Sequence, residues 1–415
     1  MRHNLNNGAQ TACQICGSFD LVEIIHMGDH APCDSLLSLE NLKNLEKVYP
    51  LCLVRCNECS LIQINYVVDP NQLFFPEYPY RTGITATLRQ NLQSGARRIN
   101  STLRLPAGSL VVDLGSNDGS YLKGFQEIGM KVVGVEPTNI AKLAIANGIP
   151  TIQQFFSKSV AKEIVEVNGK AKLVTAANMF AHVSKLNELI NGVSELIDDG
   201  IFVSESHYLL DIVEKTQFDS IYHEHLRYYS LHNLKDLFQY YGFTLVDAER
   251  IPNYGGSIRA YATKNQEIPV SDRLRMLLDV ESTSGILEID CFRNMAQKIF
   301  DIKEELSTIL KKFRSQGKTI CGIGCPGRAS TLLAFCDITT NILPYIAEQS
   351  SSLKLGLYTP NTHIPIVDEK IMFREQPDYV LMLSWHYSEP IIENLRRQGL
   401  QSSVIVPLPE IKIID

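Results

Sequence analysis

The chain has 415 residues, of which 45% are hydrophobic and 20% are charged, and its formal net charge is −7. This length exceeds one typical hydrophobic core and predicts two or three domains, while the acidic balance argues against a nucleic-acid partner. No stretch approaches the ~18 consecutive apolar residues of a membrane span. The Asn-rich segment 1–11 lacks the basic and apolar regions of a signal peptide. We therefore expect a cytoplasmic protein without membrane association.

Two cysteine pairs occur in the first part of the chain. Each has the spacing C-x-x-C, and four thiolates from two such turns can complete a tetrahedron around zinc. Four protein ligands leave no open position, so the metal is expected to be structural. Iron in the same ligands, or unrelated buried thiols, are the other interpretations. Cys33 and Cys52 lack a paired spacing and are expected to be core thiols. The predicted zinc ligands are Cys13, Cys16, Cys56 and Cys59.

Strand and helix patterns alternate along the rest of the chain. After an aromatic, proline-broken stretch at residues 74–83, a helix is expected over residues 86–105. Apolar runs then alternate with helical segments over residues 110–262, which predicts a parallel sheet with helices on both faces. Residues 269–316 have the spacing of amphipathic helices, and a second alternation follows. The predicted class is α/β: a doubly wound sheet, an N-terminal zinc-binding module and a C-terminal Rossmann-like α/β domain, with expected boundaries at 1–75, 76–265 and 266–415.

The run V-V-D-L-G-S-N-D-G at residues 111–119 places an acid at the end of a strand, followed by a glycine turn and a helix. Ligands bind at the carboxyl ends of strands in such sheets, and Gly115 permits close approach of the backbone. Glu136 ends the next strand, where an acid can accept hydrogen bonds from two ribose hydroxyls. The run lacks the G-x-G-x-x-G cradle of a dinucleotide site. A structural strand–turn–helix with an acidic cap is the alternative interpretation.

Titratable groups are concentrated in Y-H-E-H-L, residues 222–226. Histidine is the side chain best suited to move protons near neutral pH, which favours acid–base chemistry. A metal-binding pair is an alternative, although no H-E-x-x-H spacing is present, and two satisfied histidines in a helix-start turn are another. Asn178, in the segment A-N-M-F-A-H after an apolar strand, occupies a strand end where polar groups meet ligands.

A second glycine-rich turn, G-I-G-C-P-G-R-A at residues 322–329, lies between a predicted strand and a predicted helix. The backbone N–H groups of such a turn can bind an anion, and Arg328 can add a bidentate contact with a phosphate. The alternative is a dinucleotide fold reduced to a structural role.

The run D-L-G-S-N-D-G resembles the first motif of class I methyltransferases, and V-V-G-V-E-P resembles their second. In chain order, the paired C-x-x-C motifs, D-L-G-S-N-D-G, N-M-F-A-H, Y-H-E-H-L, N-Y-G-G-S-I-R, G-I-G-C-P-G-R-A-S-T-L-L and Y-T-P-N-T-H-I-P-I resemble the sugar C-methyltransferase family over nearly the whole chain. Members look like three-domain enzymes that methylate carbon 3 of nucleotide-linked 4-keto-6-deoxy sugars. Where the family usually has Lys then Gly, this chain has Arg328 then Ala329.

This resemblance implies S-adenosylmethionine and structural zinc as cofactors and an NDP-4-keto-6-deoxy sugar as substrate. His225 would be the base, and Glu224 would orient an imidazole or a sugar hydroxyl. Tyr222 would donate toward an enolate oxygen, and His182 would be a reserve base. The implied cofactor-binding residues are Asp113, Gly115, Asn117, Asp118, Glu136, Pro137, Phe155 and Asn178. The implied substrate-binding residues are Tyr78, Tyr80, Asn253, Arg328, Thr362 and His363.

Within the cofactor set, Gly115 and Asn117 would lie against the methionine part, Glu136 would hold the ribose, and Pro137 would border the adenine. The pair Phe155 and Phe156 is expected either to flank the adenine or to belong to the core. The two tyrosines of the 74–83 loop would close over the sugar. The nucleotide, deoxythymidine or guanosine, is not specified by the sequence.

Other functions fit parts of the pattern. An N- or O-methyltransferase acting on another small molecule would use the same cofactor site without a carbon-acid base. A zinc-bearing nucleic-acid-binding module with a vestigial methyltransferase core is opposed by the acidic balance. A nicotinamide reductase is opposed by the incomplete glycine fingerprint. We expect a monomer whose partner is a small molecule.

Overall fold

The computed structural model of the chain describes residues 4–75, 83 and 86–415. Within them, the N-terminal segment contributes β1 (Gly8–Ala9), β2 (Leu21–His30), β3 (Tyr49–Cys56), β4 (Ile62–Ile64), β5 (Tyr66–Val67), the 3₁₀ helix η1 (Asn41–Lys43) and α1 (Pro70–Leu73). β2, β3 and β4 form an antiparallel sheet that is extended by β11 (Arg227–Tyr228), from far along the chain, and β1 pairs separately with β5. The N-terminal sheet is therefore incomplete without a strand from the middle of the chain.

A seven-stranded sheet forms the central unit. Its strands are β6 (Leu110–Leu114), β7 (Lys131–Val135), β8 (Thr151–Ile152), β9 (Leu173–Ala177), β10 (Ile201–His207), β12 (Thr244–Ile251) and β13 (Ser257–Thr263), in the order β12-β13-β10-β9-β6-β7-β8. The five strands from β10 to β8 are parallel. The accompanying helices are α2 (Ala86–Leu103), α3 (Ser120–Glu127), α4 (Ala141–Ala146), α5 (Lys158–Asn168), α6 (Leu186–Leu196), α7 (Leu209–Glu214), α8 (Leu231–Tyr240) and the 3₁₀ helices η2 (Phe180–His182), η3 (Phe218–Ser220) and η4 (Asn253–Gly255).

The sequence predicted a parallel sheet over residues 110–262, and for its last strand this is wrong. β13 is antiparallel to both β10 and β12. A short connection containing η4 joins β12 to β13, and strands joined by a short connection lie antiparallel, because a parallel pair needs a long crossover. The five parallel strands are largely buried, as expected for a sheet covered on both faces, and β6 is buried along its full length.

The C-terminal unit has a six-stranded sheet. It follows α9 (Asp272–Ser284) and α10 (Ile289–Ser315), and its strands are β14 (Ile320–Ile323), β15 (Ile346–Glu348), β16 (Ile366–Asp368), β17 (Tyr379–Met382), β18 (Ser403–Val406) and β19 (Lys412–Ile414), in the order β16-β15-β14-β17-β18-β19. Only β19 is antiparallel to its neighbour. The helices are α11 (Gly327–Phe335), α12 (Glu369–Glu375), α13 (Ser388–Arg397) and the 3₁₀ helix η5 (Trp385–Tyr387). The predicted α/β class, with a doubly wound sheet and a second α/β unit, is confirmed.

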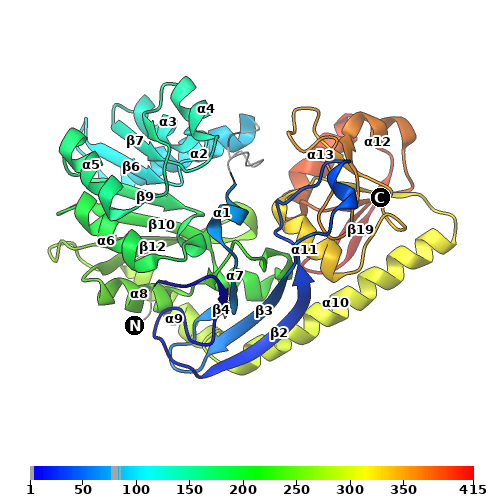
Figure 1. Cartoon of the computed structure of the whole chain (residues 1–415), viewed down its shortest axis with the longest axis horizontal. Coiled ribbons are helices and arrows are strands. Elements are labelled where there is room, and N and C mark those ends of the chain that lie inside the picture. The colour runs from blue at the N-terminus through cyan, green and yellow to red at the C-terminus, as the bar shows by residue number, and fades with distance from the viewer. Residues whose placement is uncertain (1–3, 76–82, 84–85) are drawn as a thin grey trace.

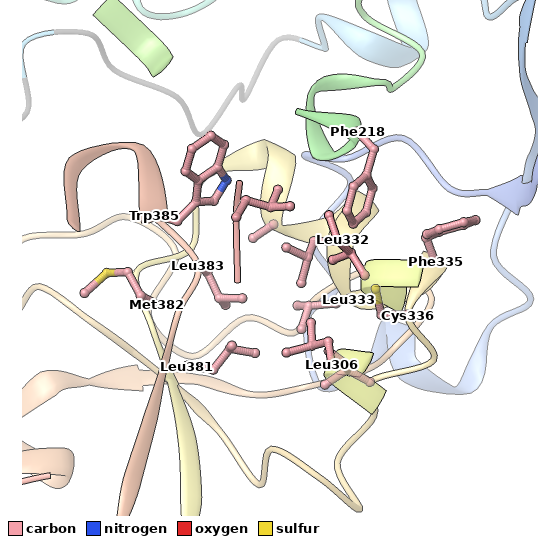
Figure 2. Packing of buried hydrophobic residues seen from close by; sticks show 14 of the residues in the cluster. Phe218, Leu306, Leu332, Leu333, Phe335, Cys336, Leu381, Met382, Leu383 and Trp385 are labelled. Carbon is pink, nitrogen blue, oxygen red and sulfur yellow. The ribbon is translucent and has the colours of Figure 1, made fainter. Parts of the chain in front are cut away.

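Helix α10 joins the parts of the molecule. Apolar residues recur along it every three or four positions and give it one buried face, as in other amphipathic helices. That face belongs to one hydrophobic cluster with the strands β2 to β4 and the C-terminal sheet. Figure 1 shows α10 running next to β2 and β3 and below the C-terminal unit, with the seven-stranded sheet at the opposite side of the view. In Figure 2, Leu306 of α10 converges with Leu332 and Leu333 of α11.

None of the helices in the described ranges combines the length and apolar character needed to cross a membrane.

Candidate functional site

Four thiols gather where the N-terminal segment folds back on itself. The Sγ atoms of Cys13, Cys16, Cys56 and Cys59 all lie within 4.8 Å of one another, and none of these cysteines is in a disulfide. The Sγ atoms of Cys13 and Cys59 are 3.5 Å apart, as are those of Cys16 and Cys56. A zinc tetrahedron with Zn–S bonds of about 2.3 Å requires sulfur–sulfur distances of about 3.8 Å, so the donor set fits this metal.

The carboxyl ends of β6 and β7 bring two buried acids together. Asp113 accepts a hydrogen bond from Thr175 Oγ1 at 2.6 Å, and burial, with a smaller contribution from Glu136, raises the pKa of its carboxyl to about 7. Gly115 follows with φ +72°, and a Cβ there would lie 2.9 Å from Met179 Cγ. The backbone therefore needs glycine at this turn, which leaves its surface open to a ligand.

Glu136 and Asp118 fix the backbone around the turn. Glu136 accepts hydrogen bonds from the N–H groups of Asn117 at 3.1 Å and Thr138 at 2.9 Å. Asp118 accepts hydrogen bonds from the N–H groups of Gly83 at 3.0 Å and Ser120 at 3.1 Å. Gly83 belongs to the segment that leads from the N-terminal module, so Asp118 also joins this segment to the turn after β6.

Of the remaining predicted cofactor residues, three lie at the same edge of the sheet and Phe155 is at the surface. Asn117 and Asn178 both have positive φ, +49° and +50°, a conformation that asparagine tolerates better than most residues. Pro137 is half-buried directly after Glu136. Phe155 is 47% exposed, and its neighbour Phe156 packs against Gly192 instead. The adenine role of Phe155 stays a prediction.

Three histidine rings meet next to this edge. The centroid of the His225 ring lies 4.8 Å from that of His182 in η2 and 4.8 Å from that of His207 at the end of β10. The Tyr222 ring lies 4.0 Å from the His225 ring. A small pocket opens between them, lined by Asn178, Ala181, His182, Ser206, His207, His225, Arg227 and Tyr228. The predicted catalytic residues His225, His182 and Tyr222 are thus brought together beside the predicted cofactor residue Asn178.

The hydrogen bonds of His225 determine its tautomer. Its Nδ1 lies 2.8 Å from the carbonyl oxygen of Ser220, which can only accept, so Nδ1 carries the proton and Nε2 keeps a lone pair. Burial, followed by the nearby His182 and His207, lowers the pKa of the imidazole well below its usual 6.5. Burial also lowers the pKa of His182 to about 4. Both rings are neutral near pH 7.

His207 is a pocket residue that the sequence analysis did not select. Its Nδ1 is buried and has no hydrogen-bond partner among the described residues. Burial lowers its pKa to about 3, and Arg328 and His182 add to the effect. The available signal was its position at the carboxyl end of the strand I-F-V-S-E-S-H, where ligands bind in doubly wound sheets.

The other two residues of the Y-H-E-H segment also contact the N-terminal module. His223 Nε2 lies 3.1 Å from the carbonyl oxygen of Pro50, and its ring packs edge-on against Tyr49 in the N-terminal module. Glu224 is buried and accepts a hydrogen bond from the Cys33 thiol at 3.4 Å. Cys33, expected to be a core thiol, is indeed buried, but it also contacts this predicted catalytic residue.

The predicted substrate residues are dispersed. Asn253 donates to Glu205 at 3.0 Å, and Arg328 is buried in an ion pair with Asp219. Thr362 shares a hydrogen bond with Thr359 at 2.7 Å, and His363 lies 2.5 Å from Glu46 of the N-terminal module. The side chains of Thr362 and His363 therefore have Thr359 and Glu46, and not Arg328, as their hydrogen-bond partners. Tyr78 and Tyr80 lie outside the described residues.

This sheet, with a glycine turn and two acids at the carboxyl ends of adjacent strands, is that of a class I methyltransferase. The family model "Methyltransferase domain" matches residues 87–248, "zinc binding domain" describes the match at residues 13–74, and "C-methyltransferase C-terminal domain" matches residues 252–409.

The C-methyltransferase NovU of Streptomyces niveus is 32% identical over 408 residues, which cover 97% of this chain and 96% of NovU. The chain therefore belongs to the sugar C-methyltransferase family. It is an S-adenosylmethionine-dependent C-methyltransferase whose four N-terminal cysteines form a zinc site.

Solved structures with a similar fold cover less than half of this chain. Magnesium protoporphyrin IX methyltransferase from Synechocystis PCC 6803, with bound SAM, is 14% identical and covers 43% of this chain and 79% of its own, with a TM-score of 0.32. A SAM-dependent methyltransferase from Archaeoglobus fulgidus is 14% identical and covers 42% of this chain and 94% of its own, with a TM-score of 0.35.

Replacing Glu136 with glutamine is expected to weaken S-adenosylmethionine binding by about 10- to 100-fold. A hydrogen bond to a charged group contributes about 1.5–3 kcal/mol, and about 1.4 kcal/mol is tenfold in Kd. Isothermal titration calorimetry of the variant measures the change. Asp199→Asn, which alters an exposed ion pair with Lys172, is the control and should bind normally. An unchanged Kd for Glu136→Gln would mean that this acid does not hold the ribose.

Proposed function

We propose that this enzyme transfers a methyl group to carbon 3 of a nucleotide-linked 4-keto-6-deoxy sugar in deoxysugar biosynthesis. The observation that carries the proposal is the state of His225: a buried, neutral imidazole whose Nδ1–H is held by a carbonyl, next to the cofactor edge of the sheet. Methylation at carbon needs such a base, because a carbon-bound proton must leave first. The similarity to the C-methyltransferase NovU supports this choice of reaction.

The proposed reaction begins at the carbon acid. A ketone at carbon 4 acidifies the proton on carbon 3, and Nε2 of His225 accepts that proton while the C–H electron pair forms the enolate. When bound along Gly115, Asn117, Glu136 and Pro137, S-adenosylmethionine supplies an electrophilic methyl group. Carbon 3 of the enolate would form the new carbon–carbon bond as the methyl–sulfur bond breaks, and S-adenosylhomocysteine would leave with the electron pair of that bond. The carbonyl at carbon 4 would be restored.

The residues around His225 suit the charge that develops on the enolate oxygen. Burial raises the pKa of the Tyr222 phenol well above its usual 10, so its hydroxyl keeps its proton and can donate a hydrogen bond. Glu224 is proposed to orient an imidazole or a sugar hydroxyl, and His182 is the reserve base. A neutral His207 adds a second donor or acceptor on the pocket wall.

We propose that the substrate contacts both the central and the C-terminal units, which we place at residues 76–265 and 266–415, after a zinc module at residues 1–75. Tyr78 and Tyr80 are proposed to close over the sugar. Asn253, Thr362 and His363 are proposed to contact the nucleotide-linked sugar.

Hydrogen exchange at carbon 3 tests this function directly. The enzyme is incubated in heavy water with dTDP- and GDP-linked 4-keto-6-deoxyhexoses, with and without S-adenosylmethionine, and the products are analysed by NMR. The proposal expects enzyme-dependent deuterium incorporation at carbon 3 and a new methyl group on the same carbon. Methylation at an oxygen or nitrogen would reject the carbon-acid mechanism and leave the cofactor site unaffected.

The pH profile of kcat/KM should reflect the lowered pKa of His225. Only the neutral imidazole can accept a proton, and a lowered pKa keeps it neutral to a lower pH. The acid limb of kcat/KM, which reports the free enzyme, is therefore expected below the usual histidine pKa of 6.5. Initial rates at subsaturating sugar measure this limb, and a midpoint at or above 6.5 would contradict the assignment.

A further inference from the structure

The Ser220 carbonyl that accepts a hydrogen bond from His225 lies in η3, a segment that the C-terminal unit contacts closely. This carbonyl accepts from His225 Nδ1 at 2.8 Å and from the Tyr228 hydroxyl at 3.3 Å. Ser220 is the last residue of η3, and both its N–H and its hydroxyl donate to the Gln217 carbonyl, at 3.0 and 2.6 Å. The position of η3 therefore sets where the Nδ1–H of His225 points.

Asp219, the residue before Ser220, is completely buried and receives three hydrogen bonds from the C-terminal unit. Arg328 donates from Nε at 2.7 Å and from Nη2 at 2.6 Å, in a bidentate pair. Trp385 Nε1 donates to the same carboxylate at 2.7 Å, and the guanidinium lies 5.1 Å from the Trp385 ring centroid. Bidentate guanidinium–carboxylate pairs fix orientation as well as distance.

Two further hydrogen bonds of the Arg328 side chain also reach the central unit. Nη2 donates to Gln217 Oε1 at 3.1 Å, and Nη1 donates to the Tyr254 carbonyl at 3.0 Å. Gln217 in turn donates from Nε2 to the Gly255 carbonyl at 2.9 Å. The two residues are in close contact, because a Cβ added to Gly255 would lie only 2.7 Å from Gln217 Oε1. These four side-chain hydrogen bonds of Arg328 join its helix, α11, to η3 and to the turn that contains Tyr254.

Residues at both ends of η3 also contact α11. The Phe218 ring lies 5.5 Å from the Phe335 ring, and Thr331 Oγ1 donates to the Ile221 carbonyl at 3.2 Å. Figure 2 shows Phe218 directed toward Leu332 and Phe335 of α11, with Trp385 on the far side of the helix. The segment is anchored at residues 218, 219 and 221, so the Ser220 carbonyl between them has little freedom.

We propose that Arg328, Asp219 and Trp385 are positioning residues through which the C-terminal unit fixes the tautomer and orientation of His225. This role rests on the proposed function of His225 as the base. It differs from the phosphate role that the sequence suggested for Arg328, because four of the five guanidinium N–H donors are hydrogen-bonded within the protein and the residue is only 5% exposed. The C-terminal unit then acts on proton transfer and not only on substrate binding.

The experiment uses the full-length enzyme and the variants Arg328→Gln, Asp219→Asn, Trp385→Phe and the double variant Arg328→Gln/Asp219→Asn. For each, kcat, KM and deuterium incorporation at carbon 3 are measured, together with dTDP and GDP binding by calorimetry and thermal unfolding. Asp378→Asn, which removes an exposed ion pair with Lys318 in the same unit, is the matched control. His225→Ala is included to test the base itself.

A positioning role predicts that the single variants at 328 and 219 lower kcat and the exchange rate about 100-fold, since misplacement of a reacting group by about 1 Å can cost that much. Trp385→Phe should lose less, and KM and nucleotide binding should change little. The double variant should recover part of the loss, because two amides can hydrogen-bond without an unpaired buried charge. Asp378→Asn should retain the parent rates.

Three results would overturn the proposal. Weaker dTDP or GDP binding with unchanged kcat in Arg328→Gln would make Arg328 a phosphate ligand. If the variants unfold at lower temperatures but the folded enzyme exchanges deuterium at the parent rate, the ion pair stabilises the fold and does not position His225. If the double variant recovers none of the lost activity, Arg328 and Asp219 do not act through their mutual ion pair. Full exchange in His225→Ala would instead reject the proposed base, whatever the other variants do.

Discussion

His225→Ala is expected to lower kcat by about 100- to 10,000-fold, the range that a positioned general base contributes. The loss should appear in both methyl transfer and solvent deuterium incorporation at carbon 3, since the same proton transfer precedes both. Calorimetry should show S-adenosylmethionine binding close to that of the parent enzyme, because Asp113 and Glu136 lie at the ends of β6 and β7, outside the segment that carries His225. Parent-level exchange in the folded variant would rule out His225 as the base.

The same segment provides a matched control two residues away. His223→Ala removes an imidazole that faces Pro50 and Tyr49 in the N-terminal module, away from the pocket. It should cost some stability, because a buried hydrogen bond and ring packing are lost, but kcat should stay within a few-fold. Equal losses at both positions would mean that the whole segment had shifted and that neither histidine had been tested individually.

Cys56→Ser is expected to abolish zinc binding and most of the folding stability. Structural zinc sites contribute about 10–16 kcal/mol in small domains at pH 7, comparable with the total stability of about 5–15 kcal/mol of a typical protein. Cys56 is fully buried at the end of β3, and the thiols share a hydrophobic cluster with the central sheet. Metal analysis and thermal unfolding by circular dichroism, with the parent enzyme in excess chelator as a parallel sample, measure the effect.

Cys291→Ser is the control for this prediction, since this thiol is half-buried on α10 and outside the four-cysteine cluster. It should keep one zinc per chain and an unfolding temperature near that of the parent. Activity should fall along with zinc in Cys56→Ser, because Asn233 of the central unit donates to the Cys59 carbonyl at 2.7 Å and β11 is hydrogen-bonded to β4. A zinc-free enzyme that unfolds at the parent temperature would contradict the structural role.

The features that depend on local sequence could be predicted. The turn at Gly115 was predicted because an apolar run, an acid, a glycine and a helical segment are contiguous in the chain, and the structure has a strand, a glycine with φ +72° and a helix there. The zinc ligands were found because two C-x-x-C turns each place two thiols on one side of the chain. The direction of β13 was missed, because apolar runs show where strands are but not which way their neighbours run.

Contacts between segments that are far apart in the chain could not be predicted from the sequence. Nothing near Asp219 indicates that its carboxylate meets Arg328, more than 100 positions later, and the glycine-rich turn before Arg328 pointed to a phosphate instead. His207 was missed for a similar reason: an isolated histidine at a strand end acquires meaning only when His182 and His225 arrive beside it. The assignments at Tyr78, Tyr80 and the other substrate residues stay predictions.

The pairing of β4 with β11 also constrains how the chain folds during synthesis. The N-terminal strands leave the ribosome first, yet the partner of β4 is made about 160 residues later, and the helix that buries the sheet, α10, later still. At about 5–20 residues per second, the nascent sheet waits roughly 10–60 s for α10 to be completed. Early zinc binding would hold the cysteine turns together during that interval, while the apolar faces of these strands still lack the helix that buries them in the folded protein.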